Sequence, residues 1–218
     1  MKIAIVGGTG DLGEALAKRL CSKYEVIVGS RSAEKASVAA QKIRQEVKKT
    51  LGTEVDVKGF QNEMASSLAD VVVLAVPYEF ALETANALSK SINPNSILVC
   101  PVVPMKKGEG GFEYSPPNSL SMAQAVSNIV KVPVVAAFHT LPAERLGDLS
   151  VQPDFDVPIC GDSKEAIETV KNIVLSIPNL RPLVVGPLKL SYLVESLTPL
   201  ILNVAIKNKL KNLSIKFV

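Results

Sequence analysis

The residues best suited to chemistry come at the start of the chain, where glycines follow a short apolar run. Gly8, Gly10 and Gly13 match the spacing G-x-G-x-x-G directly after residues 2–6 and open a helical pattern. In that context the first glycine allows a tight turn, the second lets a pyrophosphate approach the backbone, and the third lets helix and strand pack closely. The motif therefore predicts a dinucleotide at a helix N-terminus. The alternative is a glycine turn in a Rossmann-like domain that binds nothing.

The end of the second apolar run, residues 25–28, carries a hydroxyl and two cations. NAD-dependent enzymes place an acid here, which holds the ribose 2′-hydroxyl. This chain instead has Ser30 and Arg31, with Lys35 one helical turn later. A guanidinium fork matches a phosphate, and Lys35 adds a point charge. The pattern predicts NADP; the alternative is a solvated helix start with ordinary basic residues.

Later strand-like runs end in apolar segments and in the single histidine of the chain. Residues 76–77 and 101–104 are stiffened by proline and suit a flat ring such as nicotinamide, because open α/β sheets bind ligands beyond the carboxyl ends of their strands. The alternative is that these segments only end a strand and begin a loop, without binding a ligand. His139 ends the run 134–138, where it is either an acid or base or a hydrogen-bonded wall of a pocket.

The elements that must position these residues alternate between strand and helix. Strands alternating with helices imply right-handed crossovers and a parallel sheet with helices on both faces. We expect strands at 2–6, 25–28, 55–57, 71–76, 96–100 and 134–138, with helices at 11–21, 33–49, 63–68, 79–88 and 121–130 and a long loop at 101–117.

After residue 140 the alternation weakens. The pattern there predicts strands at 157–160 and 183–185 and helices at 164–176 and 193–210, with Pro199 kinking the last helix or marking its first turn. The fold class expected is α/β: a Rossmann-type NADP-binding domain at 1–140 and a smaller C-terminal α+β domain at 141–218 that closes a cleft.

Composition excludes several classes of protein. The chain is 47% apolar and 21% charged, which is typical of a globular protein, and its apolar runs are shorter than a membrane span. A net charge of +3 and the absence of tryptophan argue against nucleic-acid binding. One histidine and scattered cysteines argue against a zinc site, and we expect no bound metal. The three cysteines are widely spaced and odd in number, and a strand beginning at Lys2 leaves no room for a leader, so we expect a cytoplasmic protein.

Further motifs resemble those of a known family. Besides the glycine motif and Gly29-Ser30-Arg31, they include residues 112–115, 139–143, 156–162, 193–203 and 215–217, so that the resemblance covers nearly the whole chain. The stretch 193–203 is far more specific than the glycine motif. The chain thus resembles the archaeal NADPH-dependent F420 reductases, also called F420H2:NADP oxidoreductases.

The resemblance implies reversible hydride transfer between NADP(H) and the deazaflavin coenzyme F420. We expect the protein to be a homo-oligomer, a dimer. The resemblance implies no catalytic side chain, because proximity, orientation and exclusion of water supply most of the rate. The residues it implies are Thr9, Gly10, Asp11 and Leu12 at the pyrophosphate, Ser30, Arg31 and Lys35 at the 2′-phosphate, Val76, Phe80, Val103 and Ala143 on the nicotinamide side, and Leu213 at the deazaflavin.

Two other functions fit the same Rossmann domain. An NADPH-dependent reductase of a small imine or ketone would need a proton donor, for which His139, Tyr114 and Lys106 are the candidates. A non-enzymatic NADP sensor would bind NADPH and a protein partner without turnover. Lysines 207, 209, 211 and 216 are either a solvated face or a site for the anionic tail of F420.

Overall fold

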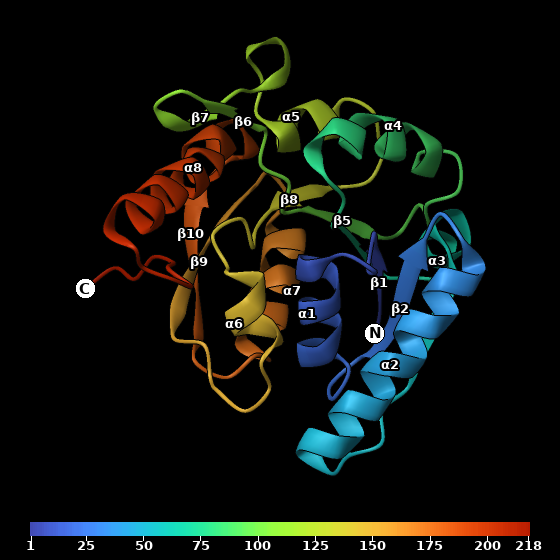
Figure 1. Cartoon of the computed structure of the whole chain (residues 1–218). Coiled ribbons are helices and arrows are strands. Elements are labelled where there is room, and N and C mark those ends of the chain that lie inside the picture. The colour runs from blue at the N-terminus through green and yellow to red at the C-terminus, as the bar shows by residue number, and fades with distance from the viewer.

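The computed structural model describes all 218 residues and is built around one eight-stranded sheet (Figure 1). Every neighbouring pair of strands is parallel except β8 and β9. The predicted Rossmann-type parallel sheet is confirmed. From one edge to the other, the strands are β10 (Leu180–Gly186), β9 (Phe155–Gly161), β8 (Val134–Ala136), β5 (Ile97–Cys100), β4 (Val71–Leu74), β1 (Lys2–Val6), β2 (Glu25–Ser30) and β3 (Val57–Gln61).

Helices cover both faces of the sheet, as expected, and each face has its own apolar core. Alternate side chains of the buried strands point to opposite faces, so that Ile3 and Ile5 pack under one layer and Ala4 and Val6 under the other. One layer contains α1 (Asp11–Leu20), α2 (Ala33–Leu51), α6 (Ala143–Gly147) and α7 (Lys164–Leu175); the other contains α3 (Asn62–Ser67), α4 (Tyr78–Leu88), α5 (Met122–Ser127) and α8 (Ser191–Asn208).

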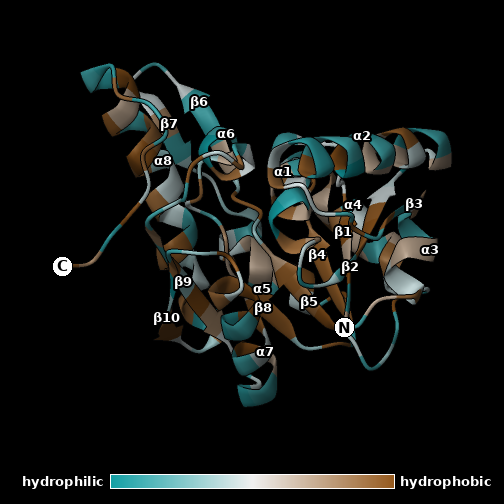
Figure 2. Ribbon diagram, turned by 90° about the horizontal axis from the view of Figure 1, so that it is seen from below, coloured by the Kyte–Doolittle hydropathy of each residue, from teal (hydrophilic) through white to brown (hydrophobic).

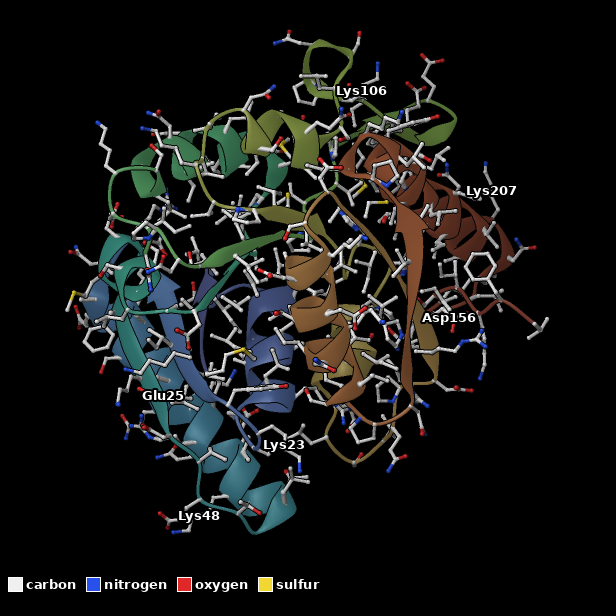
Figure 3. All side chains as sticks on the ribbon, turned by 180° about the vertical axis from the view of Figure 1, so that it is seen from behind. Lys23, Glu25, Lys48, Lys106, Asp156 and Lys207 are labelled. Carbon is white, nitrogen blue, oxygen red and sulfur yellow. The ribbon has the colours of Figure 1, made fainter.

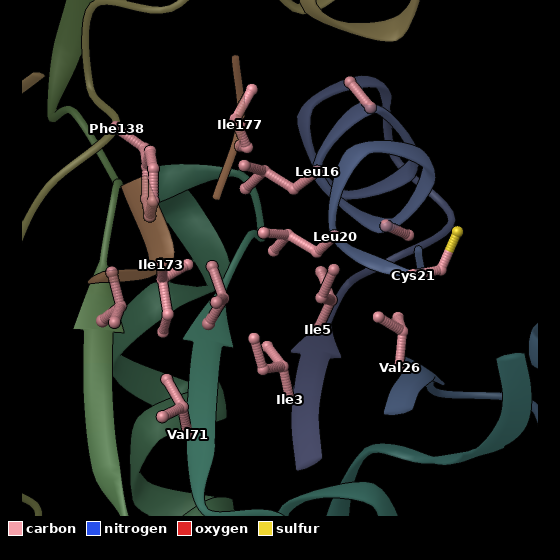
Figure 4. Close-up of a cluster of buried hydrophobic side chains, with 14 of the residues drawn as sticks. Ile3, Ile5, Leu16, Leu20, Cys21, Val26, Val71, Phe138, Ile173 and Ile177 are labelled. Carbon is pink, nitrogen blue, oxygen red and sulfur yellow. The ribbon is translucent and has the colours of Figure 1, made fainter. Parts of the chain in front are cut away.

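The first core shows how one helix is docked against the sheet. Leu16 and Leu20 of α1 point at Ile3 and Ile5 of β1, and Phe138 closes the cluster from the end of β8 (Figure 4). All five side chains are almost fully buried. The strands are correspondingly apolar in Figure 2, while the outer side of α2 is hydrophilic. This packing holds the start of α1 against the end of β1, where the glycine motif lies.

Two segments differ from the sequence-based prediction. The third strand runs over Val57–Gln61 and not over 55–57, because Gly59 lets it approach α2 so closely that a Cβ there would lie 2.3 Å from the carbonyl carbon of Ala36. The expected loop at 101–117 contains an antiparallel hairpin, β6 (Met105–Gly108) and β7 (Gly111–Tyr114). Neither segment has the alternating apolar pattern from which its strands could have been predicted.

The hairpin owes its order to α8, which lies beside it in Figure 1. The side chain of Asn203 accepts a hydrogen bond from Phe112 N at 2.7 Å and donates one to Phe112 O at 2.8 Å. Gly111 has a φ of +136° and leaves room for that amide. Contacts between segments ninety residues apart therefore create the hairpin.

Helix α8 also corrects the prediction for the C-terminal segment. It begins at Ser191, so Pro199 lies in its interior and not in its first turn. It ends at Asn208, and not at residue 210 as predicted, because Lys209 adopts a left-handed conformation with φ 54°; Lys211 therefore lies beyond the helix. The helical stretch Leu188–Asn208 is long and apolar enough to cross a membrane by length and composition alone; here it packs on α5 and β7.

Strands β9 and β10 extend the main sheet and receive the C-terminal tail. Asp156 in β9 forms a two-pronged ion pair with Arg181, both contacts at 2.7 Å, and accepts a hydrogen bond from Phe217 N. Asp156 N donates to Ile215 O at 2.9 Å, and Figure 3 shows this residue beside the tail. Because β9 is antiparallel to β8, its first residues lie at the carboxyl edge of the parallel strands. The tail is thereby brought to that edge.

Candidate dinucleotide site

The turn between β1 and α1 is shaped by its glycines. Gly7 has a φ of +76°, and a Cβ on Gly13 would lie 2.7 Å from Gly8 Cα, so strand and helix pack as closely as the motif predicts. Gly10 is different, since a Cβ there would meet nothing closer than Gly7 O at 3.4 Å. Its open side therefore leaves space for a ligand to approach the backbone.

The start of α1 is suited to an anion. Gly10 is its N-cap and provides no side-chain acceptor, so the first-turn N–H groups of Asp11 and Leu12 have no intrahelical partner. The helix dipole adds positive potential at the same point. Asp11 is exposed and Leu12 is partly buried. Backbone atoms, more than these side chains, make this end of α1 a site for a pyrophosphate.

The end of β2 presents two cations that no acid neutralises. Neither Arg31 nor Lys35 forms an ion pair. Ser32 caps α2 by accepting a hydrogen bond from Lys35 N at 3.3 Å, and Ser30 accepts one from Ser32 N at 3.4 Å. The guanidinium carbon of Arg31 lies 5.5 Å from the centre of the Phe80 ring. This cation–π contact holds Arg31 at the mouth of the site.

One pocket of about 860 Å³ joins these groups. It lies between the glycine turn, the ends of β2 and β4, and the starts of α3 and α4. The pocket is large enough for half of a dinucleotide. Of the residues singled out from the sequence, it is lined by Thr9, Gly10, Ser30, Arg31, Lys35, Val76 and Phe80. Phe80, expected on the nicotinamide side, thus contributes to the Arg31 end.

The remaining expected residues lie outside that pocket but at the same edge of the sheet. Val103 follows β5, Ala143 is the first residue of α6 after β8, and Leu213 lies in the tail bound to the start of β9; all three are partly buried. Gly8 and Gly13 are buried behind the turn, as packing glycines should be. The carboxyl ends of parallel strands meet at one edge, so these residues share the region in which a cofactor would extend.

The histidine at the end of β8 is held neutral. His139 is 6% exposed, and neither ring nitrogen has a hydrogen-bond partner. Burial lowers its pKa to about 3, although the nearby backbone of Cys100 opposes the shift. Its carbonyl oxygen is bound by Thr198 of α8, at 2.9 Å, and the adjacent Thr140 hydroxyl is also buried without a partner. An imidazole in this state is no proton donor near pH 7.

The other candidate proton donors are engaged. The Tyr114 hydroxyl donates to Glu195 Oε2 at 2.7 Å, and burial, with help from Glu195, raises the pKa of Tyr114 far above its usual value. Lys106 on the hairpin is paired with Glu113 at 3.4 Å. The cysteines are buried, and burial raises the pKa of the Cys21 thiol to about 11. The chain therefore offers little acid–base chemistry at this edge.

Sequence reasoning missed polar residues that line the pocket after β3 and along α4. The clearest is Asn62, the first residue of α3, which is 7% exposed and whose Oδ1 atom has no partner. A polar residue directly after a strand could have indicated it, but the strand itself was expected several residues earlier. Glu63, Glu83 and Thr84 complete this wall.

The basic residues near the C-terminus do not form one group. Lys216 is paired with Asp154, whereas lysines 207, 209 and 211 are exposed and have no ion-pair partner. Figure 3 shows Lys207 pointing outward from α8, far along the helix from the hairpin residue Lys106. Lys207, Lys209 and Lys211 therefore remain available to an anionic ligand, and Lys216 does not.

The fold and this pocket define a Rossmann-type dinucleotide-binding protein. Residues 2–104 match the family model described as "NADP oxidoreductase coenzyme F420-dependent". The chain is 38% identical to the F420-dependent NADP reductase of Methanocaldococcus jannaschii and 33% identical to that of Methanothermobacter marburgensis, in each case covering 99% of this chain and 97% of the relative. The chain therefore belongs to the family of F420-dependent NADP reductases, which are oxidoreductases, and the family resemblance predicted from the sequence is confirmed.

A solved structure supports the fold independently. The crystal structure of a putative F420-dependent NADP reductase from Arthrobacter sp. FB24 has a TM-score of 0.82 against this chain at 21% identity, and the match covers 100% of this chain and 99% of that one. At that identity the match bears on the fold alone. The C-terminal strands and α8 are thus part of the shared architecture.

Proposed function

We propose that this protein transfers a hydride reversibly between NADP(H) and coenzyme F420; its relatives carry the name F420-dependent NADP reductase. The observation that carries the proposal is the pocket that joins the open glycine turn to the unneutralised Arg31 and Lys35. When bound, nicotinamide and deazaflavin supply the donor and acceptor carbons. The protein binds the two carriers, aligns their rings and excludes water.

The roles of individual residues form part of the proposal. The turn at Thr9 and Gly10 and the N–H groups of Asp11 and Leu12 bind the pyrophosphate, while Gly8 and Gly13 allow the turn itself. Ser30, Arg31 and Lys35 bind the 2′-phosphate, with Phe80 stacked on the guanidinium. Val76, Val103 and Ala143 line the nicotinamide side, and Leu213 contacts the deazaflavin. The open side of Gly10 and the lack of ion pairs at Arg31 and Lys35 support these assignments.

The division into an NADP-binding part, residues 1–140, and a part that completes the deazaflavin side, residues 141–218, is likewise proposed. The return of the tail to the carboxyl edge, through Asp156 and Ile215, supports it. Both parts contribute strands to one sheet, so the second part is fixed against the first at β8 and β9.

We further propose that the protein acts as a homodimer in the cytoplasm, without nucleic-acid or membrane partners. Helix α8 exposes several large apolar side chains, and the edge strand β10, which precedes it in the chain, exposes two more. These are Tyr192, Leu193, Leu200, Val204, Ile206, Val184 and Val185. Light scattering after gel filtration tests the dimer: Leu200→Glu with Val204→Glu should give a monomer, and an unchanged mass would contradict the proposed interface.

The direct test of the activity mixes the protein, NADPH and F420 and follows the visible absorption of the oxidised deazaflavin. We expect bleaching in proportion to NADPH consumed, and the reverse reaction from reduced F420 and NADP. NADH should support the reaction poorly. NADPH binding without bleaching would favour the NADP sensor, and NADPH consumption with an imine or ketone in place of F420 would favour the alternative reductase.

His139 separates the two enzymatic functions. A positioned acid or base contributes about 10²–10⁴-fold to the rate. If His139 is a neutral pocket wall, His139→Asn should cost less than about 100-fold in single-turnover hydride transfer. A larger loss, together with the disappearance of one limb of the pH–rate profile, would favour the imine or ketone reductase.

A further inference from the structure

Asn62 is a polar side chain without a partner inside the pocket wall. It is the first residue of α3 and directly follows Gln61, which pairs with Ser30 in the ladder between β3 and β2. The side chain is 7% exposed and its Oδ1 atom has no hydrogen-bond partner. Buried amide groups are nearly always paired, because leaving one unpaired costs free energy. Such an exception at a binding pocket calls for a ligand.

The surrounding backbone is arranged to admit this amide. A Cβ on Gly29 would lie 2.9 Å from Asn62 Oδ1, so a larger residue at that position would crowd the amide in its present orientation. Gly29 is the residue before Ser30, at the end of β2, and Asn62 lines the same pocket as Ser30 and Arg31. The amide thus lies over the end of β2, and no other side chain in the protein satisfies it.

The position of Asn62 at the end of β2 indicates which part of the dinucleotide it contacts. In dinucleotide-binding sheets the end of β2 faces the adenosine ribose. Arg31 and Lys35 can neutralise a phosphate there, whereas a neutral amide can both donate and accept and is therefore matched to a hydroxyl. We propose that Asn62 hydrogen-bonds a hydroxyl of the adenosine ribose and that this contact gives affinity for the dinucleotide irrespective of its 2′-phosphate. The inference rests on the proposed NADP-binding function.

The contact should leave a signature that differs from that of Arg31. Asn62→Leu keeps the approximate size and removes both polar atoms, so it should weaken NADPH and NADH by the same factor, about 5- to 20-fold. Binding of reduced nicotinamide mononucleotide, which lacks adenosine, should not change.

Stability provides a second readout that a merely structural asparagine would not give. Removing an unpaired buried amide should leave the thermal midpoint of the ligand-free protein unchanged or raise it. The upward shift of the midpoint by 2′,5′-ADP should shrink. Asn93→Leu is the matched control, because Asn93 donates to Ala69 O at 3.2 Å and accepts from Asn95 N at 3.0 Å. That variant should lower the midpoint and leave the dissociation constants unchanged.

The experiment is calorimetric titration of wild-type and variant proteins with 2′,5′-ADP, NADPH, NADH and reduced nicotinamide mononucleotide. Failure of the wild-type protein to bind 2′,5′-ADP and NADPH would overturn the proposed function. Wild-type binding with an equal affinity of Asn62→Leu would overturn only the role of Asn62. A loss confined to NADPH would assign Asn62 to the 2′-phosphate instead. Replacing adenine by hypoxanthine should cost the same factor in both proteins; a cost absent from the variant would mean that Asn62 contacts the base and not the ribose.

Discussion

Buried polar groups are treated differently in two regions of this protein. Around Glu195 in α8, both carboxylate oxygens are satisfied: Oε2 accepts from Tyr114 and from Met122 N, and Oε1 accepts from Ala123 N at 3.0 Å. At the carboxyl edge of the sheet, Asn62 and His139 carry buried polar atoms that have no partner. The first region joins α8 to α5 and to the hairpin, and the second forms the candidate site.

In the Glu195 region the buried polar groups pair with one another and make the structure rigid. At the site they are left unpaired in the free protein and can bind a ligand. A fully paired buried network specifies one arrangement of its elements, while an unpaired polar atom lowers the stability of the free protein. The site also has charges without partners: Arg31 and Lys35 form no ion pair, whereas Arg181 and Lys216, at the C-terminal tail outside both regions, are paired with aspartates. Substitutions in the two regions should therefore have opposite consequences for stability and binding.

The largest effect is expected in the paired region. Glu195→Ala removes the acceptor of two buried backbone N–H groups and of the half-buried Tyr114 hydroxyl, and should lower the free energy of unfolding by about 3 kcal/mol. Urea denaturation measures this loss. Glu195→Gln keeps one acceptor oxygen and should lose less. Equal stability of Glu195→Ala and the wild-type protein would show that the network does not hold α8 in place.

Arg31→Ser should have little effect on stability and a large effect on binding. A charge-assisted hydrogen bond contributes about 1.5–3 kcal/mol, so the affinity for NADPH should fall roughly 10- to 100-fold while that for NADH stays nearly unchanged. Fluorescence titration with both cofactors measures the two constants. Lys49→Ser, at the far end of α2, serves as the control. An equal loss for both cofactors would remove Arg31 from the 2′-phosphate site.

His139 should make stability depend on pH in a predictable direction. Its folded pKa, about 3, lies below the ordinary value of 6.5, so the unfolded chain binds the proton more readily. The contribution of neutral His139 to the free energy of unfolding is therefore fully present above pH 6.5. It is lost as the pH falls from 6.5 toward 3, by up to about 1.4 kcal/mol per pH unit. Urea midpoints of the wild-type protein and of His139→Asn should converge or cross as the pH falls. Parallel curves would mean that the imidazole is not held neutral.

The smallest effect is expected at the exposed lysines. F420, as the family resemblance implies, carries an anionic tail, and exposed pairs contribute only a few tenths to ~1 kcal/mol each. Replacing Lys207 and Lys211 together by glutamine should raise the KM for F420 several-fold at low salt and less at high salt, with the KM for NADPH unchanged. Unchanged F420 kinetics at low ionic strength would assign these lysines to a solvated face and direct attention to Lys106 and Lys107.

Within residues 1–140, local sequence patterns were sufficient for most of the strands and helices, but not for β3 or the β6–β7 hairpin. The glycine turn, the basic end of β2 and the alternation of strands with helices all depend on contacts within a few residues of one another. Gly8 and Gly10 accordingly lie between β1 and α1, Gly13 lies in the first turn of α1, Arg31 directly follows β2, and β4 covers Val71–Leu74 of the predicted run 71–76. A buried parallel strand declares itself by continuous apolar residues, and a Rossmann turn by its glycines.

Other features were decided only by the tertiary structure. The β6–β7 hairpin is held by Asn203, some ninety residues away, and the tail reaches the carboxyl edge because β9 reverses direction beside β8. The buried position of Asn62 Oδ1 depends on its contact with Gly29, a neighbour across the sheet. Strand order and strand direction bring these residues together, and neither is encoded in the spacing of any single segment. The sequence by itself determined the class of the protein and predicted which residues bind phosphate, whereas the order of the strands decided which polar side chains remain unpaired at the site, because pairing depends on what the fold places opposite each one.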